Sequence, residues 1–427
     1  MFRSAASGYI CGDSLTMNIL FLTLVQFDNL RMHNIYTDLL QEFVDQGHFV
    51  YAISPVERRQ NVQTHLSQDD ERAKVLRLRI GNTQKTNMIE KGISTVTLEQ
   101  TFIRAIKKYT ADIRFDLVLY STPPITLCNA VQYVRQRDHA KTYLLLKDIF
   151  PQNSLDLGIL QTSGIKGVLY RMFRKKEQKF YRISDYIGCM SQANVDYVLR
   201  HNDLSDHQII EVNPNCICPS KKRQISEDER VALREKYGIP VDKCAFLYGG
   251  NLGKPQDVRH IVACLRACEV IDDTVFVIAG SGTDRYRLEQ YVNQERPQHV
   301  ILLPQIPIAE YERMVGCCDV GLIFLDHRFT IPNFPSRLLS YMDAGLPVLA
   351  ATDSNTDVGT VICEGGFGVW CESNGTESFV SCIRQMLDAD RRVQMGACAR
   401  TYLEEHYTAR RGYDTIMSHF DKALDKR

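Results

Sequence analysis

The sequence predicts an α/β fold made of two doubly wound parallel-sheet domains that face each other across an interdomain cleft. Three observations carry this prediction: 427 residues exceed one ordinary domain, short apolar runs alternate with helical patterns in both halves, and a polar stretch from Asn213 to about Asp242 interrupts that alternation. The runs are almost continuously apolar, as parallel strands covered on both faces by helices should be.

The first half opens with the apolar run Ile19–Val25 and a predicted helix from about Asn34 to Gln46, which Gly47 ends. The other strands predicted there are Phe49–Ser54, Val75–Arg79, Leu117–Tyr120, Thr142–Lys147 and Tyr186–Met190. The strands predicted in the second half are Cys244–Tyr248, Val275–Ala279, Val300–Leu303, Val320–Leu325, Val348–Ala351 and Phe367–Trp370. Helical patterns follow over Glu377–Leu387, Asp390–His406 and Thr408–Leu424.

These patterns divide the chain into five segments. We expect an N-terminal extension over 1–16, a first domain over 17–215, a linker over 216–242, a second domain over 243–405, and a C-terminal helix over 406–427 that can pack back on the first domain. Residues 1–16 lack the apolar core of a signal peptide, and Met17 is a candidate start.

Composition narrows the classes of function. The 51 basic and 51 acidic residues balance, which gives no global reason to expect a nucleic-acid partner. The 14 cysteines form no Cys-x2-Cys pair, so a reduced cytosol fits them better than a zinc site or a disulfide framework. No apolar run has the length of a membrane span.

The most informative segment is Gly249–Gln256, which reads GGNLGKPQ directly after a predicted strand. Glycines let backbone N–H groups approach an anion, a helix predicted from about Pro255 to Val270 would present its positive end, and Lys254 adds a charge. The alternative is a tight connection with no ligand, because a glycine-rich turn alone is a weak signal.

A second junction of the same kind begins at Phe334 and precedes the strand at Val348–Ala351. Ser336 stands where a helix N-cap is expected, and Arg337 offers the planar fork that binds phosphate oxygens. Two such junctions in one half predict one diphosphate site with Lys254 and Arg337 as its cations, although either side chain can instead be an ordinary surface cation.

Several local patterns occur in the order found in one enzyme family: Met17–Leu24, Ser121–Pro124, Lys147–Gln152, Asp185–Ser191, Asn213–Asn215, Gly249–Gln256 and Phe334–Pro347. Over about Met17 to His406 the chain resembles the family-4 retaining glycosyltransferases of the GT-B fold, which has two Rossmann-like domains. The nearest subgroup makes bacterial capsule, O-antigen, lipopolysaccharide and exopolysaccharide. The resemblance implies a nucleotide-diphosphate sugar donor, with a UDP-sugar favoured, and a lipid-linked or polysaccharide acceptor.

The resemblance also implies site residues. The expected donor-binding residues are Gly250, Asn251, Gly253, Lys254, Gln305, Ile306, Ser336, Arg337 and Ser340, with Gln305 and Ile306 at the nucleobase. The expected acceptor-side residues are His33, Asn34, Lys147 and Asp148. Asp148, Lys254 and Arg337 are the catalytic candidates, with Asp148 acting first as a substrate ligand, because in such enzymes the leaving phosphate itself is thought to take the acceptor proton. Asp148 can equally cap the turn that follows it, and His33 can be a helix cap or surface residue.

One departure from the family stands out. The two glutamates that ordinarily bind the donor sugar and ribose, eight positions apart, fall here at Pro332 and Ser340. Asp326 or Asp343 can stand in for them, and Ser340 either bonds a ribose hydroxyl or faces solvent.

The sequence predicts no metal site and no cofactor. Its one Asp-x-Asp pattern, Asp388-Ala389-Asp390, lies late in the chain between two helical patterns, where a helix cap is the better interpretation than a metal-binding pair. Fixed cations and N–H dipoles would then stabilise the leaving diphosphate.

The segment 164–184 carries seven basic residues against the single acid Glu177, interleaved with apolar residues. It predicts an amphipathic basic helix, which either contacts the anionic inner membrane surface or forms a solvated cationic face over an ordinary core stripe.

The sequence thus predicts a cytoplasmic, peripheral-membrane retaining hexosyltransferase of surface-glycan synthesis. Two alternatives stay open: a nucleotide-sugar epimerase of the same architecture, which needs acid and base carboxylates in the cleft, and a non-catalytic scaffold that binds a nucleotide sugar.

Overall fold

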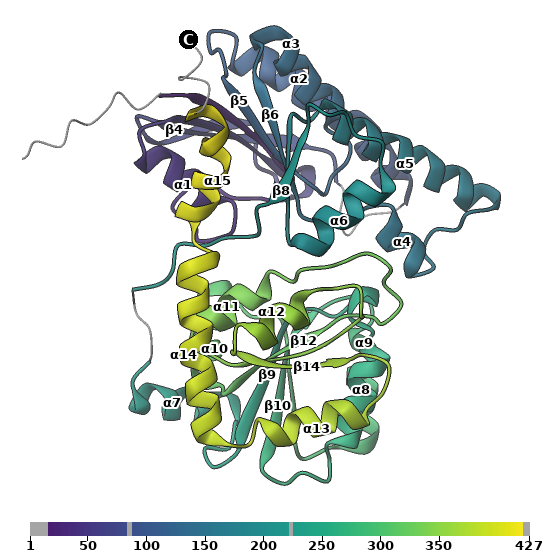
Figure 1. Ribbon diagram of the computed structural model, residues 1–427, viewed down its shortest axis with the longest axis vertical. Coiled ribbons are helices and arrows are strands. Elements are labelled where there is room, and N and C mark those ends of the chain that lie inside the picture. Colours follow the sequence, from purple (N-terminus) through teal and green to yellow (C-terminus); the bar gives the residue numbers. More distant parts are fainter. Residues whose placement is uncertain (1–15, 83–87, 222–224, 422–427) are drawn as a thin grey trace, which may run out of the picture.

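The computed structural model describes residues 16–82, 88–221 and 225–421, and it contains two α/β domains placed one above the other (Figure 1). The extension predicted over 1–16 lies outside the described residues except for its last position. Among the described ranges, no helix combines the length and the apolar character that a membrane span needs.

The first domain is built on an eight-stranded sheet with the order β3-β4-β2-β1-β5-β6-β7-β8. Its strands are β1 (Asn18–Leu22), β2 (Phe49–Glu57), β3 (His65–Asp70), β4 (Ala73–Ile80), β5 (Leu117–Ser121), β6 (Lys141–Leu146), β7 (Tyr186–Cys189) and β8 (Ile209–Val212). All neighbouring pairs are parallel except β3 with β4, so the expectation of a purely parallel sheet is wrong at this edge. The two edge strands, β3 and β8, lack the apolar runs that predicted the others.

Helices cover both faces of this sheet. They are α1 (Thr37–Asp45), α2 (Met88–Tyr109), α3 (Cys128–Asp138), α4 (Gln152–Asp156), α5 (Gly164–Ile183) and α6 (Gln192–His201), with a short 3-10 turn at Arg58–Gln60. One core lies between the sheet and α2, α3 and α5, and includes Phe102, Val131 and Phe180. The core on the other face includes Phe21 and Phe43.

The second domain has a six-stranded parallel sheet with the order β11-β10-β9-β12-β13-β14. Its strands are β9 (Cys244–Asn251), β10 (Thr274–Ser281), β11 (Val300–Leu303), β12 (Val320–Phe324), β13 (Val348–Thr352) and β14 (Gly368–Glu372). Its helices are α7 (Glu227–Tyr237), α8 (Val258–Ala267), α9 (Arg285–Glu295), α10 (Ile308–Cys317), α11 (Arg337–Asp343), α12 (Val358–Glu364), α13 (Glu377–Gln385) and α14 (Ala389–His406). Each strand predicted in this half is present, because each is apolar enough to be buried on both faces.

The segment predicted as a linker contains the helix α7, which packs on the second domain. Arg234 on α7 is fully buried and pairs with Asp319, with 2.6 Å between Nη2 and Oδ2. Its other guanidinium hydrogens are donated to the carbonyl oxygens of Cys317 and Pro240. Because a buried arginine needs all these partners, they fix α7 to the domain that follows it.

The chain crosses between the domains a second time after α14. The last helix, α15 (Ala409–Asp421), packs against α1 of the first domain, where Ile416 and Phe420 join the core (Figure 1). The two crossings run side by side: Ile217 donates its N–H to Tyr407 O, and Ala409 donates its N–H to Ile217 O. The two domains are therefore connected by two neighbouring chain segments, one at Ile217 and one at Tyr407 to Ala409, which we call the hinge.

Candidate functional site

The two junctions singled out in the sequence meet at one place in the second domain. Gly250, the next-to-last residue of β9, has φ +129°, and a Cβ atom there would lie 3.3 Å from Nη2 of Arg337, the first residue of α11. Gly280 on β10 is paired with Gly250, and a Cβ on Gly280 would collide with the Gly250 carbonyl oxygen at 1.9 Å. Glycine at both positions lets the strands and the Arg337 side chain come together.

The guanidinium of Arg337 is the central charge of this junction. Its Cζ lies 4.3 Å from the ring centroid of Tyr248, which is the geometry of a cation–π contact. Nη1 is buried, and it has no hydrogen-bond partner among the described residues. A buried charged donor without a partner is costly unless an acceptor arrives, so this atom is prepared to bind an anion.

Lys254 lies three residues beyond the end of β9, as the first residue of a 3-10 turn (Lys254–Gln256). Its side chain is exposed and forms no ion pair or hydrogen bond with the described part of the chain. The second domain thus provides two cations of different character: the planar guanidinium of Arg337 beside Gly250, and the exposed amine of Lys254 four residues further along the chain.

The backbone of the Gly249–Gln256 loop differs from the open cradle that the sequence suggested. Leu252 donates its N–H to Ser281 O, and Gly253 donates its N–H to Oε1 of Gln256, at 2.9 and 3.2 Å. The same Gln256 oxygen accepts a hydrogen bond from Asn251 Nδ2 at 2.9 Å. The N–H groups of Leu252 and Gly253 therefore already have acceptors, and the side chains of Lys254 and Arg337 are the charged groups that remain for an anion.

The helix expected from about Pro255 begins at Val258 instead, and acidic groups stand at its start. Asp257 has φ +40° at the N-cap position. Asp257, Asp326 and His327 each offer one ligand atom within 4.8 Å of the others, a set that fits a cation better than a phosphate. The α8 N-terminus is therefore not the phosphate-binding end that the sequence suggested.

Neither predicted carboxylate substitute is free to bind a sugar. Asp326 is fully buried and paired with Arg328 through Oδ1 and Oδ2. Burial alone would raise the pKa of Asp326, but the hydrogen bonds and charge of Arg328 outweigh it and hold that pKa below its ordinary value. Asp343 lies at the far end of α11, where Oδ1 accepts hydrogen bonds from Ser220 N and Arg400 Nη1.

The remaining donor-side candidates divide into two places. Ser336 occupies the N-cap position of α11, as predicted, but its side chain makes no capping hydrogen bond. Ser340 is half-buried one turn further along α11. Gln305 follows β11 and accepts a hydrogen bond from Ser281 Oγ at 2.8 Å, which joins the ends of β10 and β11, and Ile306 packs against the core beside it.

In the first domain, Lys147 and Asp148 follow β6 and point to different neighbours. Thr122 Oγ1 accepts hydrogen bonds from both backbone N–H groups, at 3.0 and 3.3 Å. Lys147 Nζ lies 3.4 Å from Asn213 O, and burial lowers the pKa of this amine to about 8. Asp148 is bonded through both oxygens to Asn153 Nδ2 at 2.9 Å, and burial raises the pKa of its carboxyl to about 6.

His33 and Asn34 are used locally. Asn34 Oδ1 accepts hydrogen bonds from the N–H groups of Tyr36 and Thr37, which begin α1. His33 is exposed, and its Nδ1 lies 3.2 Å from Asp38 Oδ1. Asp38 also accepts the N–H of Cys218 from the linker. Asn34 therefore supports the start of α1, and His33 is an exposed residue beside it, which agrees with the surface alternative for His33.

The loop between β12 and α11 closes on the first domain. Asn194 on α6 donates a hydrogen bond to Pro332 O at 2.9 Å, and Thr330 bonds to Asp156 on α4. Ile149, next to Asp148, packs with Phe329 and other residues of this loop. Pro332, at the position of the family's first glutamate, is thus buried under the first domain.

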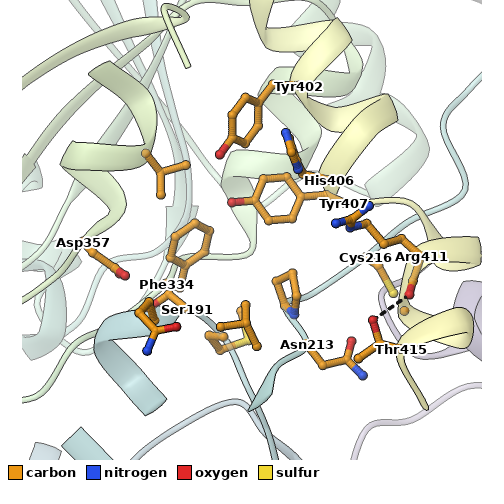
Figure 2. Close-up of a pocket in the computed structure, with 16 residues that line it drawn as sticks. Ser191, Asn213, Cys216, Phe334, Asp357, Tyr402, His406, Tyr407, Arg411 and Thr415 are labelled. Carbon is orange, nitrogen blue, oxygen red and sulfur yellow. Dashed lines mark hydrogen bonds between the residues drawn. The ribbon is translucent and has the colours of Figure 1, made fainter. Parts of the chain in front are cut away.

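A cavity of about 320 Å³ lies at the hinge side of the interface. Figure 2 shows Tyr402, His406 and Tyr407 from the end of α14 on one side, with Ser191 and Asp357 on the other. None of the residues predicted for donor or acceptor lines this cavity. Sequence reasoning did not find it, because its walls come from five segments far apart in the chain.

Several partners of the site residues were also missed: Tyr248 under Arg337, Gln256 in the loop, and Thr122 and Asn153 around Asp148. Each acts from another element, or from a loop position with no special pattern. Asp388, in contrast, caps α14 by accepting the Arg391 N–H, as predicted.

Residues 229–402 match the family described as "Glycosyl transferases group 1". Across the wider chain, the probable glycosyltransferase WbjE of Pseudomonas aeruginosa is 21% identical over 328 residues, which are 76% of this chain and 79% of the relative. The putative colanic acid biosynthesis glycosyl transferase WcaI of Escherichia coli (strain K12) is 21% identical over 276 residues, which are 64% of this chain and 66% of that protein.

Solved structures establish the fold. The sucrose-phosphate synthase of Thermosynechococcus elongatus is similar with a TM-score of 0.71 at 13% identity, over 96% of this chain and all of that one. Anabaena HepE, solved in complex with UDP and glucose, is similar with a TM-score of 0.66 at 13% identity, over 95% and 100% of the two chains. The predicted two-domain GT-B architecture is thereby confirmed.

Proposed function

We propose that this chain, whose residues 229–402 match the group 1 glycosyl transferases, is a retaining hexosyltransferase of surface-glycan synthesis. It moves a sugar from a nucleotide-diphosphate sugar, with a UDP-sugar favoured, to a lipid-linked or polysaccharide acceptor at the cytoplasmic membrane face. Two relatives, a probable glycosyltransferase and a putative glycosyl transferase of colanic acid biosynthesis, support the class of product. The Anabaena structure with UDP and glucose supports the class of donor.

One observation carries the proposal: the buried guanidinium of Arg337 with an unpartnered Nη1 beside Gly250. In doubly wound folds ligands bind outside the carboxyl ends of the strands, and Gly250 is at the carboxyl end of β9. Arg337 would grip one phosphate with its fork while the exposed Lys254 closes over the other as a point charge.

The proposed chemistry follows from this charge. As the bond between the sugar C1 and the phosphate oxygen breaks, negative charge grows on the leaving diphosphate, where the two cations stabilise it. The acceptor oxygen forms its bond to C1 on the same face of the sugar, and its proton passes to the departing phosphate oxygen. The anomeric configuration is then retained without a carboxylate nucleophile.

Asp148 is the carboxylate on the first-domain side of this reaction. It follows β6 next to Ile149, whose side chain packs with the loop of the second domain, so Asp148 lies beside the domain interface. We assign it to hold a hydroxyl of the substrate, because the two oxygens of the carboxyl can accept further hydrogen bonds beside those from Asn153 Nδ2 and the backbone N–H of Ile149.

A non-catalytic nucleotide-sugar scaffold is the second candidate. The observation that favours it is the pair of positions 332 and 340, where a buried proline and a serine replace the family's two glutamates. Such a protein would bind the same nucleotide and transfer nothing.

The first experiment is thermal denaturation with UDP, GDP, ADP or CMP, each with and without EDTA. A ligand that binds only the folded state must raise the melting temperature, so we expect a saturable rise with UDP that EDTA leaves unchanged. Lys254→Ala should weaken the rise and Arg337→Ala should abolish it. Lys141→Ala is the matched control, since Lys141 is an exposed lysine at the opposite end of β6.

No rise with any nucleotide would refute the donor site. A rise that both site variants keep would refute the assigned residues. Release of UDP from UDP-sugars by the wild type, lost in Arg337→Ala, separates the transferase from the scaffold, because a scaffold has no turnover to lose.

A further inference from the structure

The helix α5 exposes an apolar stripe that no part of the described chain covers. Ile165, Val168, Leu169 and Met172 are 83%, 58%, 40% and 44% exposed. Their spacing of three, one and three residues places them on one face of the helix. Scattered apolar side chains are common on surfaces, but four on one helical face form a contiguous patch.

The opposite face of α5 explains how the helix is held without this stripe. Phe180 and Tyr181 lie in the core of the first domain. Nearer the N-terminus, Phe173 packs edge-on against Phe150, and Tyr170 donates a hydrogen bond to Gln152 Oε1 at 2.9 Å. The helix is therefore fixed by its other residues, and the stripe remains outside the fold.

The exposed charges of α5 itself are all positive. Lys166, Lys175 and Lys176 are exposed and form no ion pair with described residues. The helix has one acid, Glu177, which is buried and paired with Arg174. The surface that surrounds the apolar stripe therefore attracts anions.

We propose that the stripe of α5 inserts into an anionic lipid surface, with Lys166, Lys175 and Lys176 at the headgroups. An amphipathic helix with an apolar face and basic flanks lies in the plane of such a surface. A second copy of the chain fits the patch poorly, because a two-fold contact through α5 would bring the same lysines together. Figure 1 shows α5 extending outward from the edge of the first domain, where a flat surface can reach it.

This inference rests on the proposed function for its biological purpose, and it adds a place for the acceptor. The segment that contacts α5, Phe150 to Gln152, begins two residues after Asp148. Gln152 also bonds to Thr330 of the second domain at 3.4 Å. Through the face opposite the stripe, α5 is thus joined to the acceptor side of the domain interface, and docking of the stripe on a lipid surface would hold that side of the protein near the membrane.

The test is flotation of the full chain with vesicles of equal parts phosphatidylglycerol and phosphatidylcholine, compared with phosphatidylcholine alone. We expect binding to the anionic vesicles that weakens with salt. Ile165→Ser with Val168→Ser should lower the partition coefficient by roughly a hundredfold, because two inserted apolar side chains are lost. Lys175→Glu with Lys176→Glu should remove the preference for anionic lipid.

The matched control is Val270→Ser with Val393→Ser, which removes two side chains of 77% and 75% exposure from the second domain. This control should bind as the wild type does. Absence of binding to anionic vesicles, or equal binding by control and stripe variants, would overturn the proposal. So would a dimer of the wild type that the stripe variant converts to monomer. Binding is measured without donor, and the UDP-dependent melting shift of each variant reports separately on the proposed function.

Discussion

Replacing Asp148 should raise the stability of the protein and at the same time lower its activity in sugar transfer. The substitution is Asp148→Asn, which keeps the shape of the side chain and removes its charge. Asn153 Nδ2 is the hydrogen-bond donor to both oxygens, and no described lysine or arginine forms an ion pair with them. Burial therefore disfavours the charged form and raises the pKa from 3.8 to about 6.

The direction in which stability changes with pH follows from the number of protons that the folded and unfolded states bind. Between about pH 4 and pH 6 the folded state keeps a proton that the unfolded state has released, so the stability of the wild type falls as pH rises through this window. Above the pKa of the folded state, the buried Asp148 carboxylate is charged and destabilises the folded state by the full amount. Each tenfold change in proton affinity is worth about 1.4 kcal/mol, which makes the cost about 3 kcal/mol at most. Losing one hydrogen bond of about 1 kcal/mol leaves a net gain of about 2 kcal/mol for the variant.

The assay is the difference in melting temperature between Asp148→Asn and wild type, measured from pH 4 to pH 8. For a domain of this size we expect the variant to melt about 4 to 8 °C higher at pH 7.5. The difference should fall toward pH 4 and become slightly negative there, because only the loss of the hydrogen bond remains. Sugar transfer should be lost in the same variant, because stability is commonly given up where a group is needed for activity. A difference that is zero or negative at pH 7.5, or that does not change with pH, would refute this account of the carboxyl.

Two further predictions concern the cations. Arg337→Lys keeps the charge but loses the fork and the stacking on Tyr248, so calorimetry should report UDP binding about tenfold to a hundredfold weaker, whereas Arg313→Lys on the surface should bind as the wild type does. An unchanged affinity of Arg337→Lys for UDP would show that Arg337 does not bind the nucleotide. Lys147→Met should stabilise the protein at pH 7 by about 1 to 3 kcal/mol, because burial lowers the pKa of this amine from 10.5 to about 8. Wild-type stability should then rise between pH 8 and pH 10, where the unfolded state binds more protons, and the gap to the variant should close; a gap constant with pH would contradict this.

The sequence predicted most strands because a strand buried on both faces needs a continuous apolar run. β9, β10, β12 and β13 meet that condition, and the edge strands β11 and β14 are apolar but only partly buried. β3 does not: it reads His-Leu-Ser-Gln-Asp-Asp and pairs with one neighbour at the sheet edge. α7 was read as part of a linker because its attachment rests largely on a buried arginine, and a charged residue in sequence gives no sign of burial.

The two cations of the candidate site could be predicted from the sequence, but the side-chain contacts around them could not. Lys254 and Arg337 could be chosen because their loops follow strands, and the carboxyl ends of parallel strands share one edge of a sheet. The use of the loop N–H groups by Gln256, and the engagement of Asp326 and Asp343 by arginines, depend on side-chain contacts between separate elements. The hydrophobic periodicity of the sequence gives no information on such contacts between separate elements.

The return of α15 to the first domain has a consequence for biosynthesis. Ile416, Met417 and Phe420 fill the same core as Phe43, and Tyr413 hydrogen-bonds to His48. A ribosome makes the first domain's sheet early but delivers this helix only after the whole second domain has emerged. Until then the nascent first domain exposes an apolar surface, which is a binding site for chaperones and a point of vulnerability to aggregation. The last helix thus couples the completion of the first domain to the completion of the chain.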